Sequence, residues 1–274
     1  MSNAAFELPL SAYAMEIGDA EFEFIRHVVG QNAGIALGPT KRQLVQGRLA
    51  RRVRELRLTS FAAYCDHVRN SGPEELVHLI NAITTNVTAF FRENHHFELL
   101  AQRMLPEAIQ RNAVSRRIRI WSAGCSSGEE AYSIAMTVAE NMPQGQTWDV
   151  KILAVDIDSH MIQAGVLGVY PEDRMQGIPL QQERQRRWWR RGTGAQSGMV
   201  KAKPELANMI SFRLLNLLED WPVRGPFDVI FCRNVMIYFD QTNRERLIMR
   251  FANVLADGGY LCLGHSESIH DVST

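Results

Sequence analysis

RIRIWSAGCSSGEEAYSIAMTVAE, residues 117–140, is the stretch from which the fold can be predicted. Its first half places Ile118 and Ile120 among other β-forming residues and predicts a buried parallel strand. Gly124 and Gly128 then turn the chain, and an amphipathic helix follows. A strand, a glycine turn and a helix N-terminus together are typical of a nucleotide-binding turn, because the backbone there comes close to its ligand.

The serines and acids of this turn narrow the choice of ligand. Ser126 and Ser127 each stand three residues before an acid, Glu129 and Glu130, which is the capping-box spacing that marks a helix start. The glycine spacing differs from the dinucleotide motif, and no lysine follows as it would in a phosphate loop. Two carboxylates would repel a pyrophosphate but suit a ligand with hydroxyls and positive charge, such as S-adenosylmethionine. On spacing alone, a tight turn without a ligand is an equal alternative.

Strands alternate with helices through the rest of the C-terminal part. Further strands are predicted at 150–155, 210–215, 227–232 and 260–264. This order predicts an α/β fold with a Rossmann-like parallel sheet, whose ligands lie beyond the carboxyl ends of the strands. Glu129, Asp156, Asn216, Arg233 and Asn234 all fall at those ends. Asp156 stands where a ribose is held by its hydroxyls, with a helix cap as the alternative.

The first 85 residues predict a small all-α domain. Helices are expected from residue 19 and at about 40–56, 60–70 and 73–84, whereas the first 15 residues show no periodicity. The second helix is rich in basic residues, namely Lys41, Arg42, Arg48, Arg51, Arg52, Arg54 and Arg57. Two interpretations stay open for them, a solvated helix face and a docking surface for an acidic partner. No aromatic interleaving accompanies the arginines, so nucleic acid is not expected as a partner.

Two further segments interrupt the regular pattern. Residues 84–88 are rich in threonine and predict a polar loop at a domain junction. His95 and His96 are adjacent and therefore poorly placed to share a metal, so we interpret them as capping or surface residues and expect no metal site. Residues 168–208 lack the α/β alternation and predict an inserted subdomain with a helix and short antiparallel strands. We place Trp188 and Trp189 in its core, with a peptide-binding wall as the alternative.

Composition is that of an ordinary soluble protein. Hydrophobic residues make up 46% and charged residues 22% of the 274, and the formal net charge is zero. A balanced charge gives no electrostatic reason to expect a nucleic acid or a membrane surface as partner. The four cysteines are widely spaced and predict reduced thiols in a cytosolic protein, and no segment has the pattern of a signal peptide or a membrane span.

Six motifs in order resemble the CheR-type chemotaxis receptor glutamate methyltransferases. They are NVTAFFRE, WSAGCSSGEEAYS, DID, RGTG, NLL and FCRNVMIYFD, and the similarity runs from about residue 22 to 267. The resemblance implies a helical receptor-docking domain at 1–85, a linker and helix at 86–117, and an S-adenosylmethionine-dependent methyltransferase domain at 118–274 with an inserted β-subdomain at about 168–208. S-adenosylhomocysteine would be the product.

The resemblance also implies roles for individual residues. The cofactor would be contacted by Asn86, Thr88, Arg92, Glu129, Asp156, Asn216, Leu217, Arg233 and Asn234. Arg92 and Tyr238 resemble the pair proposed to position the methyl group and the substrate carboxylate. The receptor-docking helix would present Arg48, Arg51, Arg52 and Arg54. A glutamate carboxylate is already ionised at neutral pH, so the reaction needs no general base.

The resemblance implies methyl ester formation on glutamates of bacterial chemoreceptors, by a cytoplasmic enzyme recruited to membrane receptors. Partners would be the receptors' cytoplasmic helices and, at the β-subdomain, a receptor C-terminal pentapeptide. A non-catalytic S-adenosylmethionine-binding module that tethers to receptors, and a methyltransferase acting on another substrate, remain as alternatives. Members of the family usually continue past HSES into a final hairpin, so we expect the fifth strand to lie at the sheet edge here.

Overall fold

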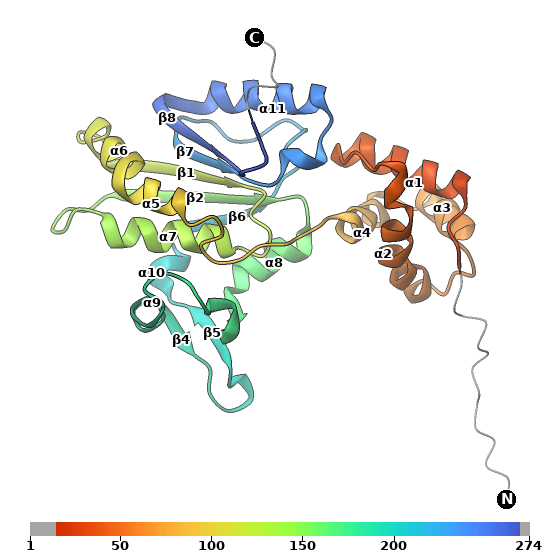
Figure 1. Ribbon diagram of the computed structural model, residues 1–274, viewed down its shortest axis with the longest axis horizontal. Helices are drawn as coiled ribbons and strands as arrows, with labels where there is room; N and C mark the ends of the chain where they lie inside the picture. Colours follow the sequence, from red (N-terminus) through yellow and green to blue (C-terminus); the bar gives the residue numbers. More distant parts are fainter. Residues whose placement is uncertain (1–14, 269–274) are drawn as a thin grey trace, which may run out of the picture. The chain divides into compact units, whose positions relative to one another are not determined.

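The computed structural model describes residues 15–268, and the chain divides between Ile83 and Thr84 into two compact units (Figure 1). The expectation for the first residues of the chain lies almost wholly outside this range. Within it, no helix has both the length and the apolar character that crossing a membrane requires.

The N-terminal unit is all-helical, as its sequence predicts. Its helices are α1 (Asp19–Ala33), α2 (Arg42–Glu55), α3 (Phe61–Asn70) and α4 (Pro73–Ile83), with a 3-10 turn at Pro39–Lys41. Gly34, in the left-handed conformation with φ +68°, ends α1, and the Ser60 hydroxyl caps α3 by accepting from the Ala63 N–H. The core is made of apolar side chains spaced three and four apart, among them Phe22, Ile25, Val29, Val45, Leu49, Val53 and Leu79.

The second unit contains a five-stranded sheet. Its strands are β1 (Arg117–Ala123), β2 (Asp149–Asp156), β6 (Ile210–Leu214), β7 (Phe227–Cys232) and β8 (Leu255–Leu263). They lie in the order β6-β2-β1-β7-β8, and every neighbouring pair is parallel. All five carboxyl ends therefore meet at one edge, as predicted. Within the described residues β8 is an edge strand, also as predicted. It begins earlier than expected because Leu255 already pairs with Phe227, and a register shift separates this pair from the regular ladder that starts at Val229 and Tyr260.

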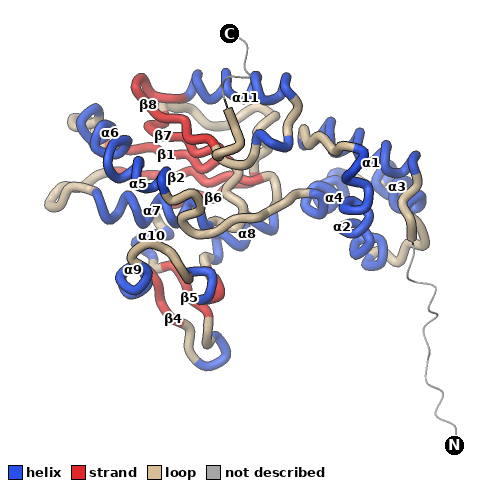
Figure 2. The backbone as a smooth tube through the Cα atoms, viewed as in Figure 1, coloured by secondary structure: helices blue, strands red, loops and turns tan. Residues whose placement is uncertain are grey.

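Helices cover both faces of this sheet (Figures 1 and 2). They are α5 (His95–Leu99), a π-helical turn (Leu100–Met104), α6 (Leu105–Arg111), α7 (Glu129–Asn141), α8 (Ser159–Leu167) and α11 (Gln241–Val254). Alternation along β1 sends Ile118 and Ile120 to the core under α7, and Trp121 to the core under α11, where it packs on Phe251 with ring centroids 5.3 Å apart.

The start of α7 differs from the predicted capping boxes. Its N-cap is Gly128, with φ +99°, and no side chain caps it. A Cβ on Gly128 would lie 3.0 Å from the Gly165 Cα, so close packing of α7 against α8 requires glycine here. The carboxylates that a capping box would use turn instead to other partners, described below.

The inserted subdomain is a second, antiparallel sheet that packs against α7. Its elements are β3 (Val169–Pro171), a 3-10 turn (Glu172–Met175), α9 (Gln181–Trp188), β4 (Trp189–Arg191), a 3-10 turn (Gly194–Gln196), β5 (Met199–Ala202) and α10 (Pro204–Ala207), in the strand order β3-β5-β4. Trp188 and Trp189 are buried, as expected, and Trp189 lies 5.5 Å from the Tyr132 ring of α7. Arg184 pairs with Glu140 at 2.7 Å and ties α9 to the same helix.

Candidate cofactor-binding site

The glycine turn after β1 is closed against its two neighbouring strands. The N–H groups of Gly124 and Cys125 both donate to the Val155 carbonyl of β2 at 2.8 Å. Gly124 has φ +87°, and a Cβ there would lie 2.3 Å from Cγ2 of Val235 in the loop after β7. The turn therefore holds the loops of three strands together, and any side chain at Gly124 would push them apart.

Glu129 is a buried carboxylate with one oxygen left without a hydrogen-bond donor. Its side chain is 0% exposed, and Oε2 accepts from the Ser127 hydroxyl at 2.6 Å. Within residues 15–268, Oε1 has no hydrogen-bond partner, and the Arg174 guanidinium lies 3.6 Å from it. An acceptor buried in this way is costly unless a donor reaches it, so the turn fits the ammonium of an amino acid and not a phosphate.

The two acids at the end of β2, Asp156 and Asp158, have different hydrogen-bond partners. Asp158 caps α8 by accepting from the His160 N–H at 2.9 Å, and also accepts from the Asn86 side chain at 2.7 Å. Asp156 accepts from the backbone N–H groups of Ser126 at 2.8 Å and Asp158 at 2.9 Å. Burial raises the pKa of Asp156 to about 6, although these two hydrogen bonds act in the opposite direction.

The linker that carries Arg92 is held in an unusual backbone conformation. Phe91 and Glu93, on either side of Arg92, have φ values of +54° and +55°, a region that side chains other than glycine rarely adopt. The Arg92 guanidinium donates to the Val87 carbonyl at 2.7 Å. The Thr88 carbonyl accepts from Arg174 at 3.2 Å, so Arg174 connects the linker to Glu129. Nothing in the sequence pattern singled out Arg174.

Arg233 is the centre of a buried ion-pair network rather than an open contact for a ligand. Its side chain is 2% exposed and lies 2.9 Å from Glu130 and 3.1 Å from Glu93, and it donates to the Arg92 carbonyl. Glu130 also accepts from the Ser122 hydroxyl at 2.7 Å. Burial raises the pKa of Glu130, and the Arg233 charge opposes that rise. The side chain predicted to contact the cofactor thus fixes the linker that carries Arg92.

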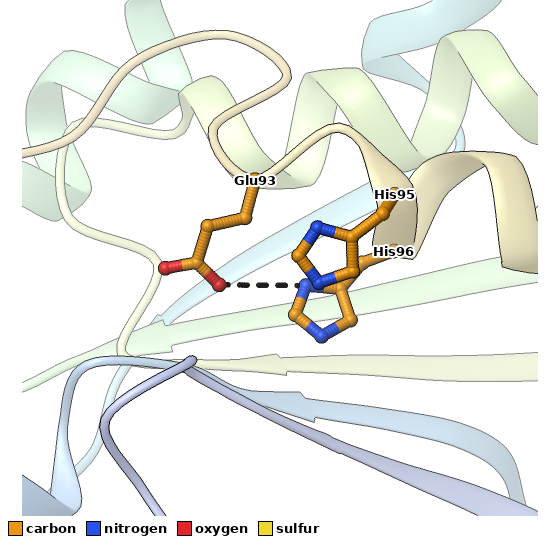
Figure 3. A group of neighbouring side chains, drawn as sticks. All are labelled: Glu93, His95 and His96. Carbon is orange, nitrogen blue, oxygen red and sulfur yellow. Dashed lines mark ion pairs between the residues drawn. The ribbon is translucent and has the colours of Figure 1, made fainter.

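Glu93, His95 and His96 form a cluster beside this network (Figure 3). Their potential ligand atoms lie within 4.8 Å of one another, although we expected the adjacent histidines to be poorly placed to share a metal. The His96 side chain is 12% exposed and caps no helix, so it is neither the surface nor the capping residue that we expected. Burial lowers the pKa of His96 to about 4, with help from the Arg233 charge. Burial opposes ionisation of Glu93, but hydrogen bonds from His265 and Arg233 hold its pKa at about 2. Oε2 of Glu93 and Nδ1 of His96 face each other at 3.5 Å, and neither has a hydrogen-bond partner among the described residues. The Arg233 guanidinium already paired with Glu93 disfavours a second cation at this carboxylate.

The residues after β6 and β7 complete the edge. Asn216 accepts from the Leu218 N–H at 3.0 Å and shapes the turn after β6, while the neighbouring Leu217 is buried. Asn234 has φ +59°, and Tyr238 ends a 3-10 turn, Met236–Tyr238. The ends of β1, β2, β6 and β7 thus place the predicted residues of these loops at one edge of the sheet, and Arg233 in the loop after β7 donates to the Arg92 carbonyl of the linker. Glu267, described below, is a member of this edge that pattern reasoning missed.

The arginines of α2 separate into two groups. Arg51 is 83% exposed and pairs with Glu55 on the next turn, and Arg54 is also exposed. Arg52 is 21% exposed and donates to the buried Glu75 at 3.0 Å, and Arg48 donates to the Ile83 carbonyl. Arg48 and Arg52 therefore stabilise the helical unit itself, which leaves two of the four predicted docking residues on the open face.

Comparisons with known proteins agree with the division of the chain into a helical unit and a second unit. A family model described as the CheR methyltransferase SAM binding domain matches residues 86–274, and one described as the CheR methyltransferase all-alpha domain matches residues 20–84. Chemotaxis protein methyltransferase 2 of Pseudomonas aeruginosa is 43% identical over 95% of this chain and 93% of that protein. The chemotaxis protein methyltransferase of Escherichia coli is 44% identical over 93% of this chain and 86% of that protein.

Proposed function

Because the chain belongs to the CheR methyltransferase family, we propose that it transfers a methyl group from S-adenosylmethionine to glutamate side chains of bacterial chemoreceptors, forming methyl esters that serve chemotactic adaptation. It is an S-adenosylmethionine-dependent methyltransferase by family. The choice of a glutamate oxygen, the receptor as substrate, and a place of action in the cytoplasm at membrane receptors are parts of the proposal.

The observation that carries the proposal is the buried Glu129 oxygen in the glycine turn that accepts no hydrogen bond from the described residues. It is positioned to accept from a ligand ammonium, which S-adenosylmethionine has and a nucleotide phosphate lacks. Asp156, ionised at neutral pH with a pKa near 6, supplies acceptor capacity for ribose hydroxyls. The remaining cofactor contacts are proposed at Asn86, Thr88, Arg92, Asn216, Leu217, Asn234 and the backbone of Arg233.

The chemistry asks little of the protein beyond orientation. When bound, S-adenosylmethionine supplies a methyl group made electrophilic by its sulfonium, and a glutamate with a pKa of about 4.3 is already ionised at neutral pH. Arg92 would orient the substrate carboxylate, and the Tyr238 hydroxyl would donate a hydrogen bond beside it. Holding the reacting groups in place can supply roughly 7–11 kcal/mol of the barrier. The network that fixes the Arg92 carbonyl therefore serves the step directly.

Two surfaces are proposed to bind the receptor. Arg51 and Arg54 of α2 form an open basic face that would dock on acidic receptor helices. In the inserted sheet, Arg190 of β4 lies directly opposite Lys201 of β5, and both are exposed. This second basic pair supports binding of a receptor C-terminal pentapeptide, which a receptor fragment shortened by its last residues would test.

The function is tested with methyl-labelled S-adenosylmethionine and a receptor cytoplasmic fragment, followed by alkali. We expect label released as volatile methanol, which reports a carboxyl methyl ester. Alkali-stable label would point to another acceptor, and bound cofactor without any transfer would favour the non-catalytic module.

The docking surface is tested by Arg51→Glu combined with Arg54→Glu. Methylation of the receptor fragment should fall while affinity for S-adenosylhomocysteine stays unchanged. The matched control is Arg117→Glu with Arg224→Glu, which changes the net charge equally at the amino ends of β1 and β7. Equal losses in both double variants would show a general charge effect and remove the specific role of α2.

A further inference from the structure

The carboxylate of Glu267 accepts four backbone hydrogen bonds at the carboxyl edge of the sheet. Oε2 accepts from the N–H groups of Asn234 at 2.8 Å and Gly264 at 2.7 Å. Oε1 accepts from the N–H groups of Val235 at 2.9 Å and Met236 at 2.8 Å. One side chain from the segment after β8 thus satisfies three successive donors in the loop after β7.

This loop needs an anion because of its backbone conformation. It follows β7 directly, and Asn234 adopts φ +59°, so the next N–H groups leave the strand ladder and converge on one point. Converging N–H groups form a concave site of positive potential, which a carboxylate neutralises. Without an acceptor, three donors in a partly buried loop would lose their hydrogen bonds, at a cost that rises with each one.

Gly264 is required for this arrangement. A Cβ on Gly264 would lie 2.6 Å from Nδ2 of Asn234 and 2.8 Å from Oε2 of Glu267. Only glycine lets the end of β8 come close enough for both the carboxylate and the loop to share the space. The close approach at the end of β8 therefore brings Glu267 to the loop after β7.

The fixed loop carries groups of the proposed site on both sides. Asn234 is a proposed cofactor contact, Val235 packs against Gly124 of the glycine turn, and Tyr238 follows at the end of the next 3-10 turn. We propose that Glu267 is a positioning residue: by binding the N–H groups of residues 234–236 it sets the loop that presents Asn234 to the cofactor and Tyr238 to the reacting groups. This inference rests on the proposed function.

The test is Glu267→Gln, which keeps the size of the side chain. Each carboxylate oxygen accepts two N–H groups, so whichever way the amide is turned, two N–H donors face its NH2 group. Charge-assisted hydrogen bonds of this kind lead us to expect an affinity for S-adenosylhomocysteine weaker by about tenfold or more. We expect a comparable fall in kcat and an unchanged KM for the receptor fragment. Hydrogen exchange at residues 234–236 should become faster.

Controls separate a positioning role from a loss of folding. Glu245→Gln alters a half-buried acid on α11 that accepts a hydrogen bond from Gln241, and it should leave every parameter unchanged. Glu267→Asp keeps the charge and should recover part of the affinity, and it serves as the second variant if the amide variant does not fold. Wild-type affinity and kcat in a folded Glu267→Gln protein would overturn the inference. Failure of the wild-type protein to bind S-adenosylhomocysteine would instead overturn the proposed function.

Discussion

Replacing Arg233 by methionine removes the cation that two buried carboxylates share. In the native protein the guanidinium is 2% exposed and lies 2.9 Å from Glu130 and 3.1 Å from Glu93. Removing one partner of a buried ion pair costs about 3–5 kcal/mol, because the other charge is left without compensation. Protonation of Glu130 reduces this cost, because burial already raises the pKa of its carboxyl group. We therefore expect a loss of about 3 kcal/mol, near the lower limit of that range.

Intrinsic tryptophan fluorescence measures this loss of stability in the second unit, which contains Arg233. All five tryptophans lie in the second unit, at positions Trp121, Trp148, Trp188, Trp189 and Trp221. Urea unfolding followed by their emission therefore reports the methyltransferase unit without interference from the helical one. For a unit of this size, about 3 kcal/mol corresponds to a fall in Tm of roughly 6–12 °C. The control Arg103→Met breaks a solvent-exposed pair with Glu107 and should leave the stability close to that of the wild type.

The pH dependence gives the prediction a sign. Without Arg233 the folded-state pKa of Glu130 rises further above its unfolded value, so the folded variant gains protons relative to the unfolded chain as the pH falls. The deficit of Arg233→Met relative to wild type should therefore shrink between pH 7 and pH 5. A deficit below about 1 kcal/mol at pH 7, or one that grows on acidification, would refute the buried-pair reasoning.

Two further predictions concern titrating groups of the same unit. Affinity for S-adenosylhomocysteine should fall as the pH drops through about 6, the pKa of Asp156. Calorimetry should find this pH dependence absent in Asp156→Asn. Equal pH dependence in both proteins would remove Asp156 from the site. The pKa of His96 in the folded protein is lowered to about 4, whereas its unfolded value is about 6.5. Its contribution to stability is therefore fully present above pH 6.5 and is lost as the pH falls from there toward 4. In His96→Asn, the free energy of unfolding in urea should depend less on pH over this interval.

The sequence predicted the sheet well because its strands carry strong local signals. FDVIFC, residues 227–232, is a continuous apolar run, and the structure buries all six residues in β7. Parallel strands place their carboxyl ends together, so the gathering of Glu129, Asp156 and Asn234 at one edge followed from topology alone. The helical unit was equally accessible, because its apolar residues recur at helical spacing.

The sequence did not predict which charged side chains form ion pairs with each other. Glu130 stands at a capping-box position and was interpreted as a helix-end charge, yet its partner Arg233 lies 103 residues away. Arg52 belongs to a run of similar arginines, and only the fold shows that it faces the buried Glu75 while Arg51 faces outward. Such pairings depend on which faces meet after folding, and neither spacing nor composition specifies them. Glu267 was missed as well, although its place shortly after the last strand is a local signal that could have identified it.

A double variant can separate two roles of the ion-pair network, which are to place the linker that carries Arg92 and to stabilise the fold. Well-packed apolar side chains of similar volume often replace a buried ion pair without loss of stability. Combining Arg233→Met with Glu130→Leu should therefore restore much of the unfolding free energy lost in Arg233→Met alone. It should not restore methyl transfer, because the Arg92 carbonyl and Glu93 still lack the guanidinium that fixes the linker. If kcat recovers together with stability, the network only supports the fold. If stability recovers and kcat does not, the charges are required for their geometry, and Arg92 depends on Arg233 for its place in the site.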